Sequence, residues 1–587
     1  MRLKYSNLSS AAIKNFFKNK FSIFLITIII SSIWVFIISF NNFAKGIDFT
    51  DSTLTYNFSL KVLKGEVPFR DFHLFVMPFA IYVEAFFHKL FGENIMINSY
   101  LGLFNKFLQT YLIYLILNVF TKNFKKSLVF SMFIMAIMGD LNAVYFSFTP
   151  LAKTLSFACI YLALLSTKQI KYVFFLGIAI GLTFITKQNF GIIIFLAYII
   201  YQIYLISLSK INLKNSYKEI FFCSIGISLI LIPFFIYFHS VNATEEIFYI
   251  LKTGSERKSV AGFLSLEFYN TFIPFLNPKV FLSSLIIGSW GTFIVFKKNL
   301  KFISLTLVLI SLLGFLSLYF GGQFKNLLEV FLYDAPKLTL PFFLIYFYFF
   351  KKDSNKETLI FILLTFSLVY VNELSWPGRG SISLKTLTTL FIFILPICLT
   401  NYEAEKNQII NNLTKFSIIS FNLIFGLLSI FFPKDYFRRD FNASTSITLP
   451  PLLVNRKTSP QHKEAILKAR SIYQKDCLGE KSFIFPWAPI LYKFIGSENV
   501  TRYDLPYHDW LTEKEADEII QILNSKSPCL LIIDESSLTK SGRKSPFKAY
   551  PMRKIESFLK SGFLNNYEKV ETLKTYTENK FVYRKIK

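Results

Sequence analysis

The sequence has 587 residues, of which 53% are hydrophobic, and a mean hydropathy of +0.44. This is more apolar surface than one water-soluble core can bury, so the composition excludes an ordinary soluble globular protein. The formal net charge of +27 would suit nucleic acid, but the lysines and arginines punctuate apolar runs and form no basic tail or arm. Nucleic acid is therefore not an expected partner.

The apolar runs predict about thirteen membrane-spanning helices. Runs such as 21–40, 220–238 and 302–320 approach or reach the ~20 residues that a helix needs to cross a hydrocarbon core of ~30 Å. The first run is long for a signal peptide and no small-residue cleavage pattern follows it, so we expect an uncleaved anchor. With charged residues as loop markers, the spans are placed at 21–42, 99–120, 127–146, 149–166, 171–186, 190–208, 220–238, 281–296, 302–320, 337–350, 357–372, 386–400 and 416–432.

The basic connections set the expected orientation. Lysines cluster before the first span and in every second connection, and the positive-inside rule places such segments in the cytoplasm. An odd number of spans then puts the N-terminus inside and everything after about Pro433 outside. The abundance of Phe, Ile, Lys and Asn is typical of an AT-rich bacterial genome, so we expect an integral protein of a bacterial inner membrane with a periplasmic C-terminal domain. The same topology would also suit an enzyme of the endoplasmic reticulum, with the lumen in place of the periplasm.

The first outside loop, residues 43–98, is much longer than a connection needs to be. Residues 54–63 and 79–91 have helical spacing of apolar residues, and Glu84 and His88 fall one turn apart in the second segment. We expect two helices lying in the plane of the membrane interface. A polar turn with glycine and proline, residues 65–72, joins them.

The C-terminal residues differ in character from the rest, because their charges are evenly spread and they contain no further spanning run. Residues 482–486 and 529–534 are predicted to be buried strands, and residues 512–524 a helix that opens with a Thr-x-x-Glu capping box. The expected fold is an α-helical polytopic membrane domain, residues 1–432, followed by a small soluble α/β domain, residues 433–587.

The cysteines give little support for a metal site. Cys159, Cys223 and Cys398 lie in apolar runs, where they pack as small hydrophobes, while Cys477 and Cys529 could form a disulfide or remain two free thiols. His73 and His88 have no partners at metal-ligand spacing, and we interpret both as interfacial residues. No metal site is predicted.

Carboxylates directly beyond the first span are the first candidates for chemistry. Asp48 and Asp51 follow it, and a carboxylate that is partly desolvated at a membrane surface can take a proton from an acceptor hydroxyl or hold a cation. Acidic residues at such a position can equally be solvated and without a chemical role.

Several segments together resemble the glycosyltransferase C superfamily. They are residues 51–56 (DSTLTY), 63–72 (LKGEVPFRDF) and 89–92 (KLFG). Members are polytopic enzymes that use polyprenyl-phosphate-linked sugars, and they include protein O-mannosyltransferases and aminoarabinose transferases. The resemblance implies that Asp51 is the catalytic base. Ser52 stands where the family often has Glu, so the division of roles between Asp51 and Asp48 stays open.

The resemblance continues farther along the chain. Residues 186–191 (TKQNFG) are similar to a turn between two short helices of the family, which places Lys187 outside. A lysine there is suited to a lipid-linked phosphate, although it could also be a simple interfacial anchor. Residues 485–492 (FPWAPILY) and 499–503 (NVTRY) resemble segments in the soluble tails of such enzymes.

Other residues are weaker candidates, each with solvation or structure as the alternative. Arg257 and Arg379 could bind phosphate or pyrophosphate. Arg70 and Asp71 could form an ion pair that shapes the loop or could contribute to an acceptor groove. Asp140, near the outer end of the third span, could be a second acidic member of the site.

The resemblance implies an inverting transfer of a sugar from a polyprenyl-phosphate donor to a hydroxyl of a glycan, lipid or protein acceptor. No nucleotide-binding fold and no cofactor are expected, while a role for a divalent cation stays open. The alternatives are a lipid-linked glycan polymerase or ligase, a flippase or other transporter, and a structural or sensory protein. Clustering of the charges at the interfaces disfavours transport.

Overall fold

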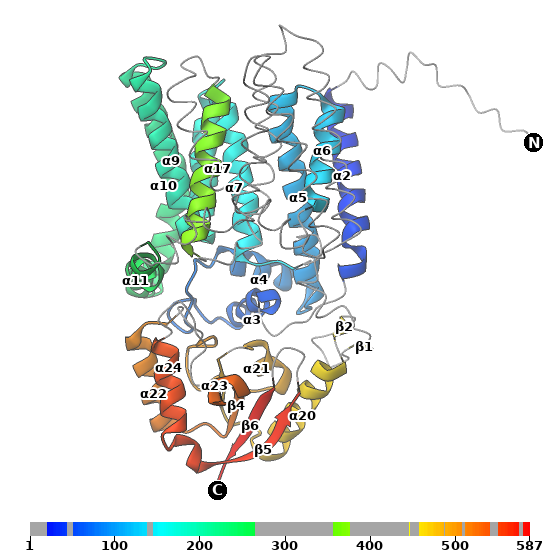
Figure 1. Ribbon diagram of the computed structural model, residues 1–587, viewed down its shortest axis with the longest axis vertical. Coiled ribbons are helices and arrows are strands. Elements are labelled where there is room, and N and C mark those ends of the chain that lie inside the picture. The colour runs from blue at the N-terminus through cyan, green and yellow to red at the C-terminus, as the bar shows by residue number, and fades with distance from the viewer. Residues whose placement is uncertain are drawn as a thin grey trace, which may run out of the picture.

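The computed structural model has a bundle of helices at one end and a mixed helix-and-strand domain at the other (Figure 1). Two short helices, α3 and α4, lie between them (Figure 1). The structure describes residues 20–43, 51–137, 145–263, 356–375, 445–446, 457–458, 460–486, 488–506, 511–539, 550–574 and 579–586.

Each predicted span that falls within the described residues contains a helix, although Tyr145 and Phe146, at the end of the span predicted at 127–146, are not helical. The helices of the bundle are α2 (Lys20–Phe43), α5 (Met96–Thr121), α6 (Phe124–Ile137), α7 (Phe148–Ser166), α8 (Lys171–Thr186), α9 (Gln188–Ser207), α10 (Leu213–Ser240) and α17 (Lys356–Ser375). The spans predicted at 281–296, 302–320, 337–350, 386–400 and 416–432 lie outside the described residues. The count of thirteen therefore stays a prediction.

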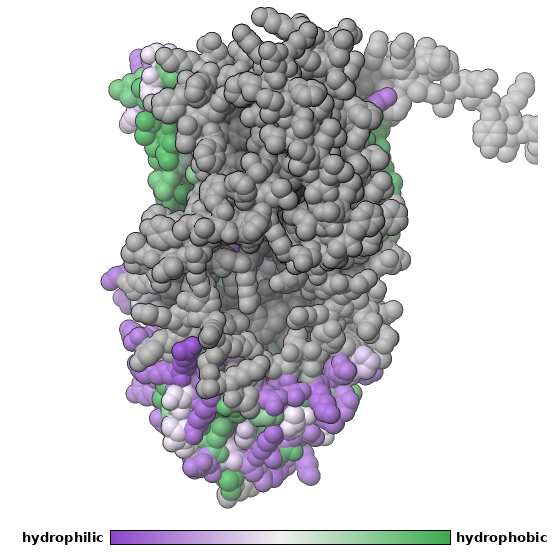
Figure 2. Space-filling view, in the orientation of Figure 1, coloured by the Kyte–Doolittle hydropathy of each residue, from purple (hydrophilic) through white to green (hydrophobic). Residues whose placement is uncertain are grey.

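Four of the described helices, α5, α7, α9 and α10, are long and apolar enough to cross a membrane, and α8 and the segment Leu25–Phe36 of α2 are shorter apolar helices. Large apolar side chains of α10 are exposed, as expected of a helix that faces lipid. Figure 2 shows hydrophobic residues along α10 at the left edge of the bundle and hydrophilic residues gathered over the C-terminal domain.

Helices α8 and α10 approach each other closely through two glycines. A Cβ atom at Gly177 would lie 2.1 Å from the carbonyl oxygen of Cys223, and one at Gly226 would lie 2.3 Å from that of Phe174. Only glycine fits at these two positions. Small residues at helix contacts are the usual means of close packing in membranes, where burial of apolar surface does not by itself drive association.

The first outside loop contains both predicted helices, α3 (Asp51–Leu63) and α4 (Phe79–Phe91). Leu54 and Phe58 of α3 pack with Phe238 of α10 in one apolar cluster, while Tyr56 and Leu60 pack with residues of the C-terminal domain in another. Helix α3 is thus held on both sides and is not simply immersed in a membrane surface. A further helix, α11 (Thr244–Phe263), occupies a segment that the sequence analysis treated as a loop.

The C-terminal residues form a four-stranded sheet in the order β3-β4-β6-β5. Strands β3 (Ser482–Phe485) and β4 (Leu530–Asp534) are parallel, as expected of buried strands joined through a helix, and coincide with the two predicted strands. Strands β5 (Tyr567–Leu573) and β6 (Lys580–Lys585) add antiparallel ladders. A separate pair, β1 (Thr445–Ser446) and β2 (Lys457–Thr458), is very short.

Helices cover both faces of this sheet. One apolar cluster joins it to α20 (Pro460–Asp476) and α21 (Ile490–Ile495), and another joins it to α22 (Glu513–Lys526), α24 (Tyr550–Lys560) and the 3-10 turn η7 (Phe563–Asn566). The short helix α23 (Glu535–Thr539) follows β4. The predicted capping box of α22 is present, and Cys477 and Cys529 form a disulfide.

Candidate functional site

Asp51 is the first residue of α3. A carboxylate at a helix N-terminus is favoured by the unpaired backbone N–H groups and the helix dipole. The packing of Leu54 and Phe58 toward the bundle and of Tyr56 toward the C-terminal domain fixes where this helix begins. Asp48 lies outside the described residues, and so does the side chain of Asp51.

Lys187 separates α8 from α9, and its extended backbone (φ −151°, ψ 97°) breaks the helical path. The residue is only 7% exposed, its Nζ donates to Thr149 Oγ1 at 3.5 Å, and it lies 4.4 Å from the centre of the Phe190 ring. Gln188 Nε2 donates to the Phe75 carbonyl at 3.5 Å. The predicted turn therefore lies against the first outside loop, on the side of α3 and α4.

Two further lysines are buried inside the bundle, Lys106 of α5 and Lys153 of α7. Both lie in the half of their helix nearer the first outside loop, and Thr149, the partner of Lys187, lies one turn before Lys153. Buried charges in a membrane require compensation by partners, water or a ligand, so such residues mark functional sites. Neither lysine is among the candidates predicted from the sequence, because lysines served there as loop markers, although a lysine within an apolar span is itself a signal.

Hydrogen bonds between α5 and α7 fix the helices that carry these lysines. Thr154 Oγ1 donates to Asn105 Oδ1 at 2.6 Å, and Gln109 Nε2 donates to Thr154 Oγ1 at 2.9 Å and to the Pro150 carbonyl at 3.1 Å. These bonds set the register of residues next to Lys106 and Lys153. The three lysines thus come from neighbouring elements at one end of the bundle.

Glu84 and His88 form a buried pair one turn apart on α4. The distance from His88 Nε2 to Glu84 Oε1 is 3.5 Å, and neither side chain is exposed. The two are therefore packed inside the protein and do not lie exposed at the membrane interface, where we expected them. Asn98 Nδ2 donates to Glu84 Oε1 at 2.9 Å and to the Phe146 carbonyl at 2.8 Å, and Phe146 N donates back to Asn98 Oδ1 at 3.1 Å. This network positions the chain just before α7 begins.

Arg70 and Asp71 form an exposed ion pair at 2.8 Å. Asp71 Oδ2 also accepts the Val67 N–H at 2.7 Å, which closes the turn before α4. The hydrogen bond from Arg70 lowers the pKa of the Asp71 carboxyl below its ordinary value. The ion pair thus shapes this loop, and a contribution of Arg70 and Asp71 to an acceptor groove stays a prediction.

Of the remaining candidates, only the backbone of Arg257 lies among the described residues. Arg257 lies on α11, but its side chain is outside the description. Arg379 and Asp140 lie outside the described residues. These positions stay predictions.

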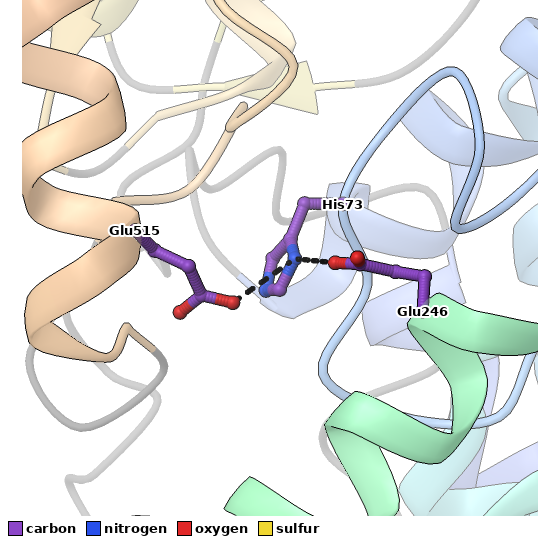
Figure 3. Close-up of side chains that lie close together, drawn as sticks. All are labelled: His73, Glu246 and Glu515. Atoms are coloured by element: carbon purple, nitrogen blue, oxygen red, sulfur yellow. Dashed lines mark ion pairs between the residues drawn. The ribbon is translucent and has the colours of Figure 1, made fainter.

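Within the described ranges, one group of three side chains brings possible metal-ligand atoms within 4.8 Å of one another: His73, Glu246 and Glu515 (Figure 3). They come from the loop between α3 and α4, from α11 and from α22. Sequence spacing could not indicate this group, because its members are far apart in the chain and only the fold brings them together.

No protein-family model and no curated protein sequence matches the chain. Among solved structures, the chain is similar to ArnT from Cupriavidus metallidurans bound to undecaprenyl phosphate, with 12% identity over 96% of this chain and 98% of that chain and a TM-score of 0.43. It is likewise similar to the apo state of that ArnT, with 11% identity over 96% of this chain and 97% of the other and a TM-score of 0.44.

Proposed function

We propose that the chain is a membrane glycosyltransferase that moves a sugar from a polyprenyl-phosphate-linked donor to an acceptor hydroxyl on the extracytoplasmic side, with inversion at the anomeric carbon. One observation carries the proposal: three buried lysines, Lys106, Lys153 and Lys187, gather at the end of the bundle that meets the loop starting at Asp51.

The lysines suit the phosphate of the donor. Negative charge develops on the lipid phosphate as its bond to the sugar breaks, and cations held away from water stabilise such charge more than solvated ones do. Lys187 is placed by the break between α8 and α9 and by Thr149, so it needs little reorganisation to meet a phosphate. Arg257 and Arg379 remain additional candidates for the same role.

Asp51 is the proposed base. The acceptor oxygen attacks the anomeric carbon, its proton passes to the Asp51 carboxylate, and the bond between that carbon and the phosphate oxygen breaks in the same displacement. The lipid phosphate leaves with the bonding electrons. Asp48 is the alternative base, because it also follows the first span.

Other functions would require ionisable side chains at other places in the bundle. A flippase or transporter would need ionisable groups along a path through the whole bilayer, whereas Lys106, Lys153 and Lys187 lie toward one end of the described bundle. A polymerase or ligase would share the lipid-linked substrate, and the acceptor found in a transfer assay would separate it from the proposal.

The test is transfer of labelled sugar from a polyprenyl-phosphate donor by purified Asp51→Asn protein. Asn is also accepted at a helix start but cannot take up a proton as a carboxylate does, so we expect turnover to fall by about 10² to 10⁴-fold with normal expression. Lys187→Ala should instead weaken donor binding. Lys171→Ala, which removes an exposed lysine at the other end of α8, is the matched control.

Near-normal turnover of Asp51→Asn together with an inactive Asp48→Asn would move the base by three residues and keep the reaction. Activity in both variants would remove the proposed reaction.

A further inference from the structure

We propose that His73, Glu246 and Glu515 form a binding site for a divalent transition-metal ion of the Zn²⁺ class, which fastens the C-terminal domain to the membrane domain. His73 comes from the loop between α3 and α4, Glu246 from the first turn of α11, and Glu515 from the first turn of α22 (Figure 3). The proposal does not depend on the proposed transferase reaction.

The distances fit metal ligands better than hydrogen bonds. His73 Nδ1 lies 3.7 Å from Glu246 Oε1 and 3.6 Å from Glu515 Oε1, and the candidate ligand atoms all lie within 4.8 Å of one another. A hydrogen bond would need about 2.7 to 3.2 Å. Ligand atoms about 2.0 to 2.2 Å from a tetrahedral ion are roughly 3.4 Å apart, so small side-chain rotations would close the set around an ion.

The burial of His73 points to a ligand. Its side chain is 6% exposed, and neither ring nitrogen has a hydrogen-bond partner among the described residues. Burying an unpaired polar group costs free energy, and buried polar groups without partners are uncommon. Coordination through one ring nitrogen would satisfy the atom that lies nearest to both carboxylates.

The carboxylate of Glu515 is already oriented. Its Oε2 accepts the Thr512 N–H at 2.6 Å as part of the capping box of α22, which leaves Oε1 toward His73 (Figure 3). A ligand whose second oxygen is held by a hydrogen bond needs little ordering when a metal binds. The capping box therefore places this ligand before any ion arrives.

Other contacts hold the three backbone segments together. His73 N donates to the Arg502 carbonyl at 2.9 Å, and the His73 ring lies 5.0 Å from the Tyr503 ring. The Tyr249 hydroxyl of α11 lies 2.8 Å from the Thr512 hydroxyl at the start of α22. The site is thus built on segments whose relative positions the rest of the structure fixes.

Arg502 is the cation that competes for Glu246. Its Nη2 lies 3.5 Å from Glu246 Oε1, while its Nε lies 3.2 Å from Glu518 Oε1. Arg502 can keep its ion pair with Glu518 when Glu246 turns toward an ion. Two carboxylates then balance the charge of a divalent cation, with a neutral imidazole as the third ligand.

The experiment measures zinc in the purified full chain after removal of metal with a chelator and re-addition of Zn²⁺. We expect the wild type to retain a stoichiometric amount of zinc and to show a higher Tm with zinc than without it. Glu515→Gln should lose both effects, because Gln preserves the capping box but is a poor ligand for zinc. Glu518→Gln is the matched control, since it alters the same Arg502 cluster and removes no proposed ligand.

The rival state is a protonated imidazole held by the two carboxylates without a metal. In that case the full chain would retain no stoichiometric zinc, and added zinc would leave its Tm unchanged. That result would overturn the proposal, as would zinc retention by Glu515→Gln or by His73→Gln at the wild-type level. Stoichiometric zinc whose removal by a chelator lowers the Tm would support it.

Discussion

Asp504 and Lys61 form a buried ion pair that joins the C-terminal domain to α3. Lys61 Nζ lies 2.8 Å from Asp504 Oδ2, and the carboxylate also accepts from Asn57 Nδ2 at 3.2 Å and Asn499 Nδ2 at 3.0 Å. Burial lowers the pKa of Lys61, but the carboxylates around it, Asp504 first and then Glu66 and Glu498, together raise that pKa above the ordinary value. Lys61 therefore carries its charge at neutral pH.

Replacing Asp504 by Ala should be among the most destabilising changes at this junction. It leaves Lys61 and two amides without their shared acceptor, and breaking a buried pair costs about 3 to 5 kcal/mol. A lower Tm and faster proteolysis between the two domains would be the readouts. Glu66→Gln is the control, because Glu66 lies 3.8 Å from Lys61 and is partly exposed, so its loss should cost less than about 1 kcal/mol. Equal stability of the two variants would contradict this account.

Local spacing predicted the contacts that lie within one element and missed those made by the fold. Glu84 and His88 were expected one turn apart, and Lys187 was expected at a turn, because both expectations need only helical geometry and a break in an apolar run. The grouping of His73 with Glu246 and Glu515 depends on how α11 and α22 dock. Nothing in the neighbouring residues of any of the three carries that information.

The contact between α8 and α10 gives a prediction for an element pair. At Gly177 an added Cβ would meet the backbone oxygen of Cys223, which cannot move without shifting α10, whereas at Gly181 it would meet the Ile230 side chain at 2.9 Å. Gly177→Ala should therefore lower stability by about 1 to 3 kcal/mol, the usual cost of overpacking. Gly181→Ala is the control, and we expect it to lower the stability by less than Gly177→Ala does. Thermal unfolding in detergent would check the order, and a Gly177→Ala protein as stable as Gly181→Ala would refute it.

Elements were predictable where one periodicity dominated. The described spans follow from apolar runs, and β3 and β4 follow from short buried runs bounded by polar residues. Strands β5 and β6 were not predicted, because charged residues interrupt their apolar pattern. Strand β6 also enters the sheet between β4 and β5, out of chain order. Helix α11 was not predicted, because it has two glutamates in its first turn and carries no long apolar run.

At the scale of the whole molecule, α3 and α4 lie between the bundle and the C-terminal domain (Figure 1). Tyr56 and Leu60 pack into the C-terminal core, while Phe69 and Phe72 of the same loop pack toward α10. This arrangement places the start of α3, the Lys187 turn and the C-terminal domain at one end of the bundle. It would suit the proposed transfer, in which the lipid-linked donor comes from the membrane and the acceptor from the aqueous side.

The disulfide between Cys477 and Cys529 bears on the side of the membrane that the C-terminal domain occupies. Its sequence separation of 52 residues gives about 4 kcal/mol of stabilisation in the chain-entropy model. Disulfides persist in oxidising compartments and are rare in the bacterial cytoplasm. The pairing therefore favours the periplasmic placement that the basic connections predict.

Reporter fusions test this orientation directly. An alkaline phosphatase fused after Lys587 should be active, because that enzyme needs the oxidising periplasm, and one fused after Lys126 or Lys218 should be inactive. Lys126 and Lys218 lie near the starts of α6 and α10, at the end of the bundle opposite the Lys187 turn. A green fluorescent protein at the same sites is the matched control, since it should fluoresce only at the two internal ones. An inactive phosphatase after Lys587 in a chain that is stably expressed would place the C-terminal domain in the cytoplasm, and the proposed acceptor side with it.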